Sequence, residues 1–179
     1  MNHNLDNAEN SRLTFADFKL ALPLQKAILK LGFEFCTPIQ AQSLVHTLDG
    51  HDVTGRAQTG TGKTIAFLLT ILNDLLTNPM EDRYIAEPRA LIIAPTRELA
   101  IQIATDANML TRFCNIHIVT LVGGEEYRKQ LDALDKKAVD IVVATPGRLL
   151  DFVTNENIYL GLVELLVLDE ADRMLDMGF

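Results

Sequence analysis

Ala57-Gln58-Thr59-Gly60-Thr61-Gly62-Lys63-Thr64 is a glycine-rich segment that leads into an apolar stretch with helical spacing. The glycines let successive backbone N–H groups turn inward around phosphate oxygens, and a helix that begins near Lys63 adds its N-terminal dipole. Lys63 is placed to reach the β- and γ-phosphates of a nucleotide, and the Thr64 hydroxyl to bind Mg²⁺. Ala57 stands where the P-loop pattern GxxxxGK[ST] has glycine. The alternative is a Gly/Thr-rich turn that only caps a helix.

An acidic segment, Asp169-Glu170-Ala171-Asp172, follows the apolar run Leu165–Leu168. A carboxylate at the tip of a buried strand beside a P-loop can hold Mg²⁺, usually through water. The next carboxylate, Glu170, can orient or deprotonate the attacking water. Acidic residues also favour helix N-termini, where they offset the dipole. That alternative does not explain the phosphate-binding segment, so the two segments together predict nucleotide hydrolysis.

Short apolar runs alternate with helical stretches over most of the chain. The runs predict buried strands at 90–94, 116–122, 139–144 and 163–168, with a shorter strand at 52–54 before the glycine-rich segment. Helical spacing and stop signals predict helices at 20–31, 38–48, 63–76, 98–111, 125–136 and 148–153. This alternation predicts an α/β fold with a mainly parallel sheet covered by helices on both faces. Ligands of such sheets bind beyond the carboxyl ends of the strands.

The composition narrows the class of protein. The 179 residues include 16 Lys and Arg against 24 Asp and Glu, a net charge of −8, which argues against coating nucleic acid by bulk charge. A hydrophobic share of 48% and a charged share of 22% exclude a disordered chain. Cys36 and Cys114 form no CxxC pair, which favours a reducing cytoplasm. The apolar runs fall far short of the ~20 residues that span a membrane.

At this point the chain resembles the DEAD-box ATP-dependent RNA helicases over nearly all of its length. AQTGTGKT and DEAD are similar to that family's motifs I and II, and Pro95-Thr96-Arg97-Glu98-Leu99-Ala100 is similar to motif Ia. Gly123-Gly124 resembles the GG motif and Thr145-Pro146-Gly147-Arg148 resembles motif Ib. The segments CTPIQA, APTRELA and LDEADRM most resemble the bacterial RhlB-type helicases.

A further resemblance, to the Q motif, lies upstream of the glycine-rich segment. It consists of Gly32-Phe33 followed by Thr37-Pro38-Ile39-Gln40, with Phe15 at the family's isolated aromatic position. Cys36 departs from the family, which often has proline there, but it leaves Gln40 in place. The resemblance implies that Gln40 reads adenine, which an amide can do by donating to N7 and accepting from the N6 amine. It also implies that Phe15 packs on the base and that Thr37 supplies a hydroxyl contact. Without the motif, Phe15 is interpreted as a core residue and Gln40 as a glutamine on a helix surface.

The resemblance implies the following site residues. The catalytic residues are Lys63, Asp169 and Glu170, with Mg²⁺ held by Thr64 and Asp169, partly through water. ATP is bound by Phe15, Thr37, Gln40, Ala57, Gln58, Thr59, Gly60, Thr61, Gly62, Lys63 and Thr64. RNA is bound by Thr96, Arg97, Gly124, Thr145, Gly147 and Arg148. N–H groups near glycines, hydroxyls and guanidiniums suit phosphates and carry little sequence information, so we expect sequence-independent backbone contacts. Alone, each arginine reads as a solvated charge.

The expected domain organisation is a flexible tail at 1–12, a Q-motif region at 13–41 and a first RecA-like ATP-binding domain at 42–179. No SAT motif follows Asp172, so we expect a RecA-like domain that is truncated at its C-terminus, with the family's second domain absent. In this fold class the SAT strand lies between the P-loop strand and the DEAD strand. We therefore expect the 179 residues alone to be unstable or prone to aggregate, to bind ATP poorly and to unwind nothing.

For the full-length protein, the resemblance implies an ATP-dependent RNA helicase that couples ATP binding and hydrolysis to local RNA duplex unwinding, in bacterial RNA turnover. Its implied partners are RNA and an RNA-degradation complex, in the cytoplasm and away from membranes. One alternative is a nucleotide-gated RNA clamp that does not unwind productively. Another is a P-loop ATPase or DNA translocase outside the helicases, which Gln40 and the DEAD spelling disfavour.

Overall fold

A four-stranded parallel sheet forms the centre of the structure, a computed structural model that describes residues 13–58 and 60–178. The strand order is β2-β3-β1-β4, which confirms the α/β fold and the parallel pairing. The strands are β1 (Ala90–Ile93), β2 (Ile118–Leu121), β3 (Ile141–Ala144) and β4 (Leu165–Leu168). Each lies inside one of the four longer apolar runs.

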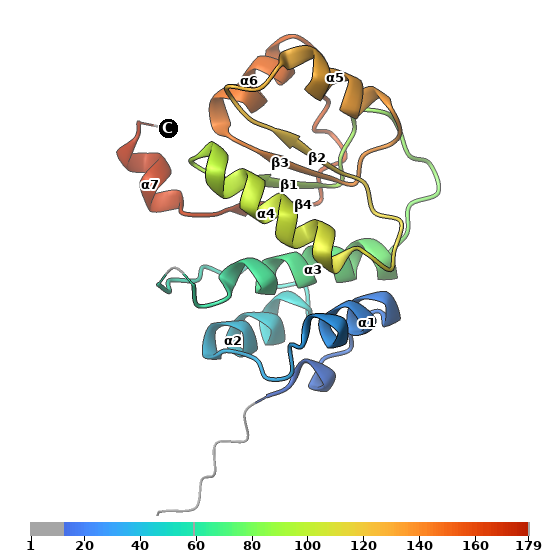
Figure 1. Ribbon diagram of the computed structural model, residues 1–179, viewed down its shortest axis with the longest axis vertical. Helices are drawn as coiled ribbons and strands as arrows, with labels where there is room; N and C mark the ends of the chain where they lie inside the picture. The colour runs from blue at the N-terminus through green and yellow to red at the C-terminus, as the bar shows by residue number, and fades with distance from the viewer. Residues whose placement is uncertain (1–12, 59, 179) are drawn as a thin grey trace, which may run out of the picture.

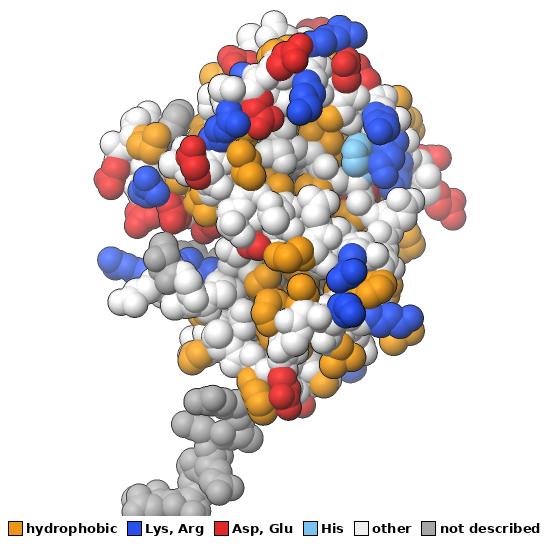
Figure 2. Space-filling model, viewed as in Figure 1, with side chains coloured by type: hydrophobic (Ala, Val, Ile, Leu, Met, Phe, Trp, Pro, Cys, Tyr) orange, Lys and Arg blue, Asp and Glu red, His pale blue; other side chains and the backbone are white. Residues whose placement is uncertain are grey.

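Helices cover both faces of the sheet (Figure 1). They are α1 (Leu22–Leu31), α2 (Pro38–Thr47), α3 (Lys63–Thr77), α4 (Arg97–Leu110), α5 (Tyr127–Asp135), α6 (Pro146–Thr154) and α7 (Ala171–Asp176), after a short 3₁₀ turn, η1 (Phe15–Asp17). One core cluster packs α1, α3 and α4 on the sheet, and the other packs α5 and α6 on the opposite face. Acidic side chains gather over α7, at the left of the space-filling view (Figure 2). Among the described residues, no helix is both long and apolar enough to cross a membrane.

β4 is an edge strand whose outer side has no partner among the described residues. Its side chains alternate between the two faces. Leu165 and Val167 pack against the cluster beneath α3 and α4. Leu166 and Leu168 point to the face of α5 and α6, but those helices do not reach β4, and the two side chains remain 57% and 53% exposed. An apolar strip therefore lies open along this edge.

The expectation of a short strand at 52–54 is wrong. These residues are exposed and pair with no strand in the described part of the chain. A strand requires a neighbour that accepts and donates its backbone hydrogen bonds, and the edge of β4 is not joined to this segment. The backbone that enters the glycine-rich segment is consequently irregular.

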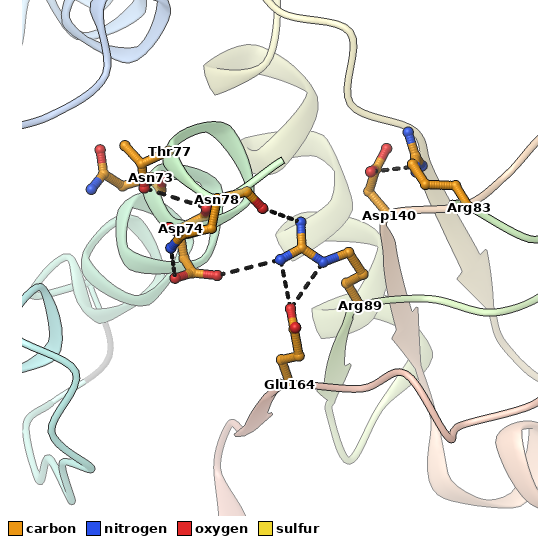
Figure 3. A network of polar contacts seen from close by, with 8 residues as sticks. All are labelled: Asn73, Asp74, Thr77, Asn78, Arg83, Arg89, Asp140 and Glu164. Carbon is orange, nitrogen blue, oxygen red and sulfur yellow. Dashed lines mark hydrogen bonds and ion pairs between the residues drawn. The ribbon is translucent and has the colours of Figure 1, made fainter. Parts of the chain in front are cut away.

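A buried arginine connects α3 to β4 at the amino end of the sheet (Figure 3). Arg89 Nη2 and Nε lie 2.6 Å and 2.9 Å from Oε2 of Glu164, and Nη1 donates to the Asn78 carbonyl at 2.8 Å. Asp74 Oδ2 lies 3.9 Å from the same guanidinium. The Arg89 side chain is only 7% exposed, so it depends on these partners for its charge. The contacts join the C-terminal part of α3 to the residue before β4.

We expect Glu164→Gln to destabilise the fold by about 1.5–3 kcal/mol, because it removes the charged acceptor of a buried guanidinium. Urea unfolding followed by circular dichroism measures this loss. Asp132→Asn is the matched control. It breaks the exposed Arg128–Asp132 pair on α5, which is worth under about 0.5 kcal/mol. Equal losses of unfolding free energy in the two variants would contradict a stabilising role for the Arg89–Glu164 ion pair.

Candidate nucleotide and nucleic-acid site

The glycine-rich segment turns directly into α3. Gly60 and Gly62 have φ angles of 79° and 88°, the left-handed region that side chains avoid. Gly62 is the N-cap of α3 and no side chain caps the helix. The first N–H groups of α3 are therefore free of intrahelical partners and available to an anion, as the P-loop prediction requires. Thr59, one of the residues expected to bind ATP, lies outside the described residues.

Lys63 folds back onto the segment that it follows. Its ammonium donates to the Ala57 carbonyl and, at 3.0 Å, to the Gln58 carbonyl, while Thr61 Oγ1 donates to the same Gln58 oxygen at 2.7 Å. These contacts hold the loop closed around the lysine. Phosphate binding requires Lys63 to exchange the two carbonyls for phosphate oxygens.

The Q-motif residues hold the glycine-rich segment from the side of α2. Thr37 Oγ1 donates to the Thr61 carbonyl at 2.8 Å, and Gln40 Nε2 donates to the Gly62 carbonyl at 3.1 Å. Gln40 Oε1 accepts from the Thr37 N–H at 2.9 Å. A Cβ at Gly62 would clash with Gln40 Nε2, so the bare backbone of glycine permits this close approach. The two motifs are thus in direct contact.

Neither residue expected to contact the base presents a free surface. Gln40 is 6% exposed with both amide atoms bonded, and Phe15 is 4% exposed within the core cluster. The Phe15 ring lies 6.3 Å from that of Phe33, which is 38% exposed. Adenine contact by Gln40 or Phe15 remains a prediction, and it requires local rearrangement of this region.

The acidic segment begins where β4 ends. Glu170 has a φ of 51° and is the N-cap of α7, and its N–H donates to Asp169 Oδ1 at 3.0 Å. A non-glycine residue in this region carries strain of the kind that marks functional sites. Glu170 Oε2 accepts from Arg173 at 3.0 Å. Asp169 thus follows the tip of β4, and Glu170 stands at the start of α7.

Burial raises the pKa of Asp169 above its usual range, an effect that the Glu170 charge reinforces, whereas the Glu170 N–H and the Lys63 ammonium oppose it. The Lys63 ammonium therefore lies close enough to influence the charge of Asp169, as expected if the glycine-rich and acidic segments serve one site. Thr64 and Asp169 offer hydroxyl and carboxylate oxygens, the hard donors that Mg²⁺ prefers. A cation would also relieve the cost of the buried Asp169 charge. The donor set therefore fits Mg²⁺.

A hollow of about 480 Å³ lies beyond the carboxyl ends of β1, β2 and β3. It is lined by Pro95, Arg97, Gly123, Thr145, Pro146, Gly147, Arg148 and Asp151. The structure thus brings together four of the six residues expected to bind RNA. Gly124 also adjoins Arg97, while the Thr96 hydroxyl accepts from the Leu99 N–H at 3.3 Å and caps α4.

The sequence that carries these segments matches a family model. The model described as DEAD/DEAH box helicase covers residues 37–179. The chain belongs to the DEAD/DEAH box helicase family. Its sheet and helices are accordingly the RecA-like fold of a DEAD-box domain.

Several relatives in this family carry the name ATP-dependent RNA helicase RhlB. The protein from Pseudomonas putida is 57% identical over 172 residues, and the one from Pseudomonas aeruginosa is 58% identical over 172 residues. Each match covers 96% of this chain and 43% of the relative. The protein from Shewanella sediminis is 50% identical over 94% of this chain and 39% of its own length. The chain thus spans less than half the length of these relatives.

Two residues near the hollow make structural contacts that the sequence did not predict. The Glu125 carboxylate pairs with Arg97 at 3.1 Å. Gln130 is 4% exposed and makes two bonds to Val122, accepting from its N–H at 2.9 Å and donating to its carbonyl at 3.2 Å, which fixes the strand end before Gly123. Glu125 follows directly after Gly123-Gly124, and this position next to the motif is the only feature of the sequence that could have indicated its role. Nothing in the sequence distinguishes Gln130 from other polar residues of α5.

Proposed function

We propose that the full-length protein is an ATP-dependent RNA helicase that couples ATP binding and hydrolysis to local RNA duplex unwinding. The observation that carries the proposal is the shared edge of the sheet. The P-loop, the DEAD segment and the arginine-lined hollow all lie beyond the carboxyl ends of the strands or at the adjoining N-terminus of α3. The names of the relatives, ATP-dependent RNA helicases, support the same function.

In this proposal, the residues of the chain divide the work on ATP. The free N–H groups of α3 and the Lys63 ammonium bind the phosphates, once Lys63 leaves the Ala57 and Gln58 carbonyls. Thr64 and Asp169 hold Mg²⁺, which neutralises charge on the phosphates when it is bound. Glu170 orients the attacking water and accepts its proton.

RNA lies in the hollow lined by Arg97 and Arg148 in this proposal. Guanidiniums form paired hydrogen bonds to phosphate oxygens, and the nearby glycines leave room for a backbone to approach. Such contacts do not read bases, so we expect binding that is independent of sequence. Bacterial RNA turnover, through an RNA-degradation complex in the cytoplasm, is the cellular role that we propose on the basis of the RhlB-named relatives.

ATP turnover by the full-length protein tests the proposal. We expect single-stranded RNA to stimulate phosphate release, single-stranded DNA of the same sequence to stimulate it much less, and a labelled RNA duplex to be separated only with ATP. Lys63→Ala, which lacks the phosphate-binding ammonium, is the inactive control. Equal stimulation by DNA and RNA would point to a DNA translocase. RNA-stimulated turnover without strand separation would point to a nucleotide-gated clamp.

Gln40→Ala is expected to erode the preference for ATP over GTP by about 1–3 kcal/mol, because an amide distinguishes the N6 amine from a carbonyl oxygen. Loss of the Gln40–Gly62 contact should weaken both nucleotides alike, so the ratio isolates base reading. Competition binding of ATP and GTP measures it. Gln42→Ala, at an exposed position of the same helix, is the control. An unchanged ratio would show that Gln40 serves only to hold the P-loop.

A further inference from the structure

One residue engages both arginines of the hollow. Glu125 Oε1 lies 3.1 Å from Arg97 Nη2, and the Glu125 backbone carbonyl accepts from Arg148 Nη1 and Nη2 at 3.3 Å and 3.4 Å. Glu125 comes from the loop between β2 and α5, whereas Arg97 begins α4 and Arg148 lies in the first turn of α6. Three elements that are distant in the sequence therefore meet at this residue.

The Arg97 guanidinium is held at a defined place by the same loop. Its Nη1 donates to the Gly123 carbonyl at 3.2 Å. A Cβ at Gly124, whose φ is 73°, would lie 2.9 Å from Nη1, so the bare glycine backbone is what allows the contact. The side chains of Arg97 and Glu125 are 38% and 35% exposed. The ion pair is thus formed at the surface of the hollow, within reach of a ligand.

A carboxylate and a phosphate use the guanidinium in the same way. Each presents two oxygens to the planar N–H fork, and each compensates its charge. One fork cannot satisfy both groups through the same N–H groups. Glu125 Oε1 accepts from one N–H group of Arg97 Nη2, so a phosphate that takes this N–H group must displace Glu125.

We propose that Glu125 is an internal competitor for RNA: its carboxylate occupies the place on Arg97 that an RNA phosphate takes, and so limits RNA affinity. The inference rests on the proposed function, because it assigns RNA to this hollow. The Glu125 backbone carbonyl keeps Arg148 in position whether or not the carboxylate has been displaced. The Asp151 carboxylate, 3.8 Å from Arg148, adds a weaker competing charge on the other side of the hollow.

The proposal fixes the sign of a substitution. Glu125→Gln keeps the shape of the side chain and the backbone contact to Arg148 but removes the competing charge. We expect this variant of the full-length protein to bind RNA about two- to fivefold more tightly, the range that corresponds to a surface ion pair. The dependence of affinity on salt should steepen, by up to about 0.7 in log K against log salt, because Arg97 then meets a phosphate without first losing a partner.

Glu126→Gln is the matched control. Glu126 is the adjacent residue, is exposed, and its side chain makes no hydrogen bond or ion pair with the described residues. The Glu126→Gln substitution removes one negative charge from the protein, as Glu125→Gln does. At about 0.15 M salt, where charges are screened over ~8 Å, we expect its affinity to stay close to that of the unsubstituted protein. The probe is a fluorescein-labelled oligouridine of roughly ten nucleotides, followed by anisotropy.

The same glutamate substitutions in an Arg97→Gln variant show whether Glu125 acts through Arg97. In Arg97→Gln protein, which we expect to bind RNA more weakly, adding Glu125→Gln should change the affinity no more than Glu126→Gln does. A gain that persists in that background, or equal gains from the two glutamate substitutions, would overturn the proposal. If the unsubstituted protein and Glu125→Gln bind the oligouridine with the same affinity, the competitor role fails while RNA binding stands. If neither binds RNA, the proposed function fails together with the inference.

Discussion

We expect Glu170→Gln in the full-length protein to bind ATP normally and to hydrolyse it far more slowly, with a barrier raised by ~2–4 kcal/mol. Glu170 follows the tip of β4, beside the proposed Mg²⁺ ligand Asp169, and its backbone is bent into the left-handed region at this point. A glutamine keeps the size of the side chain but cannot accept the proton of the attacking water. Single-turnover phosphate release and equilibrium binding of a labelled ATP analogue separate chemistry from affinity.

Arg173→Gln controls for the ion pair that the substitution also removes. Arg173 is paired with Glu170 at 3.0 Å but is 58% exposed, so its loss should cost under about 1 kcal/mol. We therefore expect Arg173→Gln to retain most of the hydrolysis rate. Near-normal hydrolysis by Glu170→Gln would refute the role of the carboxylate, and a parallel loss of ATP binding would indicate a binding role instead.

The second large effect concerns the open edge of the sheet. We expect the 179-residue chain to self-associate in solution, because β4 pairs on only one side within residues 13–58 and 60–178 and exposes the side chains of Leu166 and Leu168. Leu166→Lys should lower the association constant by tenfold or more, since burial of a leucine side chain contributes about 1.5–3 kcal/mol. Light scattering over a range of protein concentrations measures it.

Leu29→Lys is the control for this experiment. Leu29 is more exposed than Leu166, at 77%, but it lies on helix α1, which has no unpaired strand edge. We expect Leu29→Lys to leave the association unchanged. A monomeric 179-residue chain, or an equal response to the two lysines, would show that β4 is not the site of association.

Most of the fold follows from local patterns in the sequence. The run 139–144 predicts β3 because four buried aliphatic residues in succession suit a strand covered on both faces. The stretch 52–54 has a similar short pattern, but a strand exists only where a neighbour completes its hydrogen bonds. Pairing is a property of the whole sheet, and it cannot be inferred from three residues.

The site divides in the same way. Glycines and charged residues at fixed spacing predict the P-loop, the DEAD segment and the two arginines, because backbone turns and strand ends place them. The side-chain partners are not predictable at this level. The Gln40 amide donates to the Gly62 carbonyl, and the Glu125 carboxylate accepts from Arg97. Both contacts depend on side-chain rotamers that are determined by the packing of the folded chain. Motifs specify where the chemistry is, while packing determines what each side chain touches.

The contact of Arg89 with the Asn78 carbonyl holds the C-terminal end of the P-loop helix, α3, against the sheet. With 15 residues, α3 is about 22 Å long, and it is fastened to the sheet near its C-terminal end while its N-terminal end carries Lys63. A rotation of about 5° at the fastened end would shift the other end by about 2 Å over this length. Misplacement by 1 Å at a reacting centre can cost on the order of a hundredfold in rate. We therefore expect the position of Lys63 to depend partly on contacts at the far end of α3, which involve none of the residues of the glycine-rich segment.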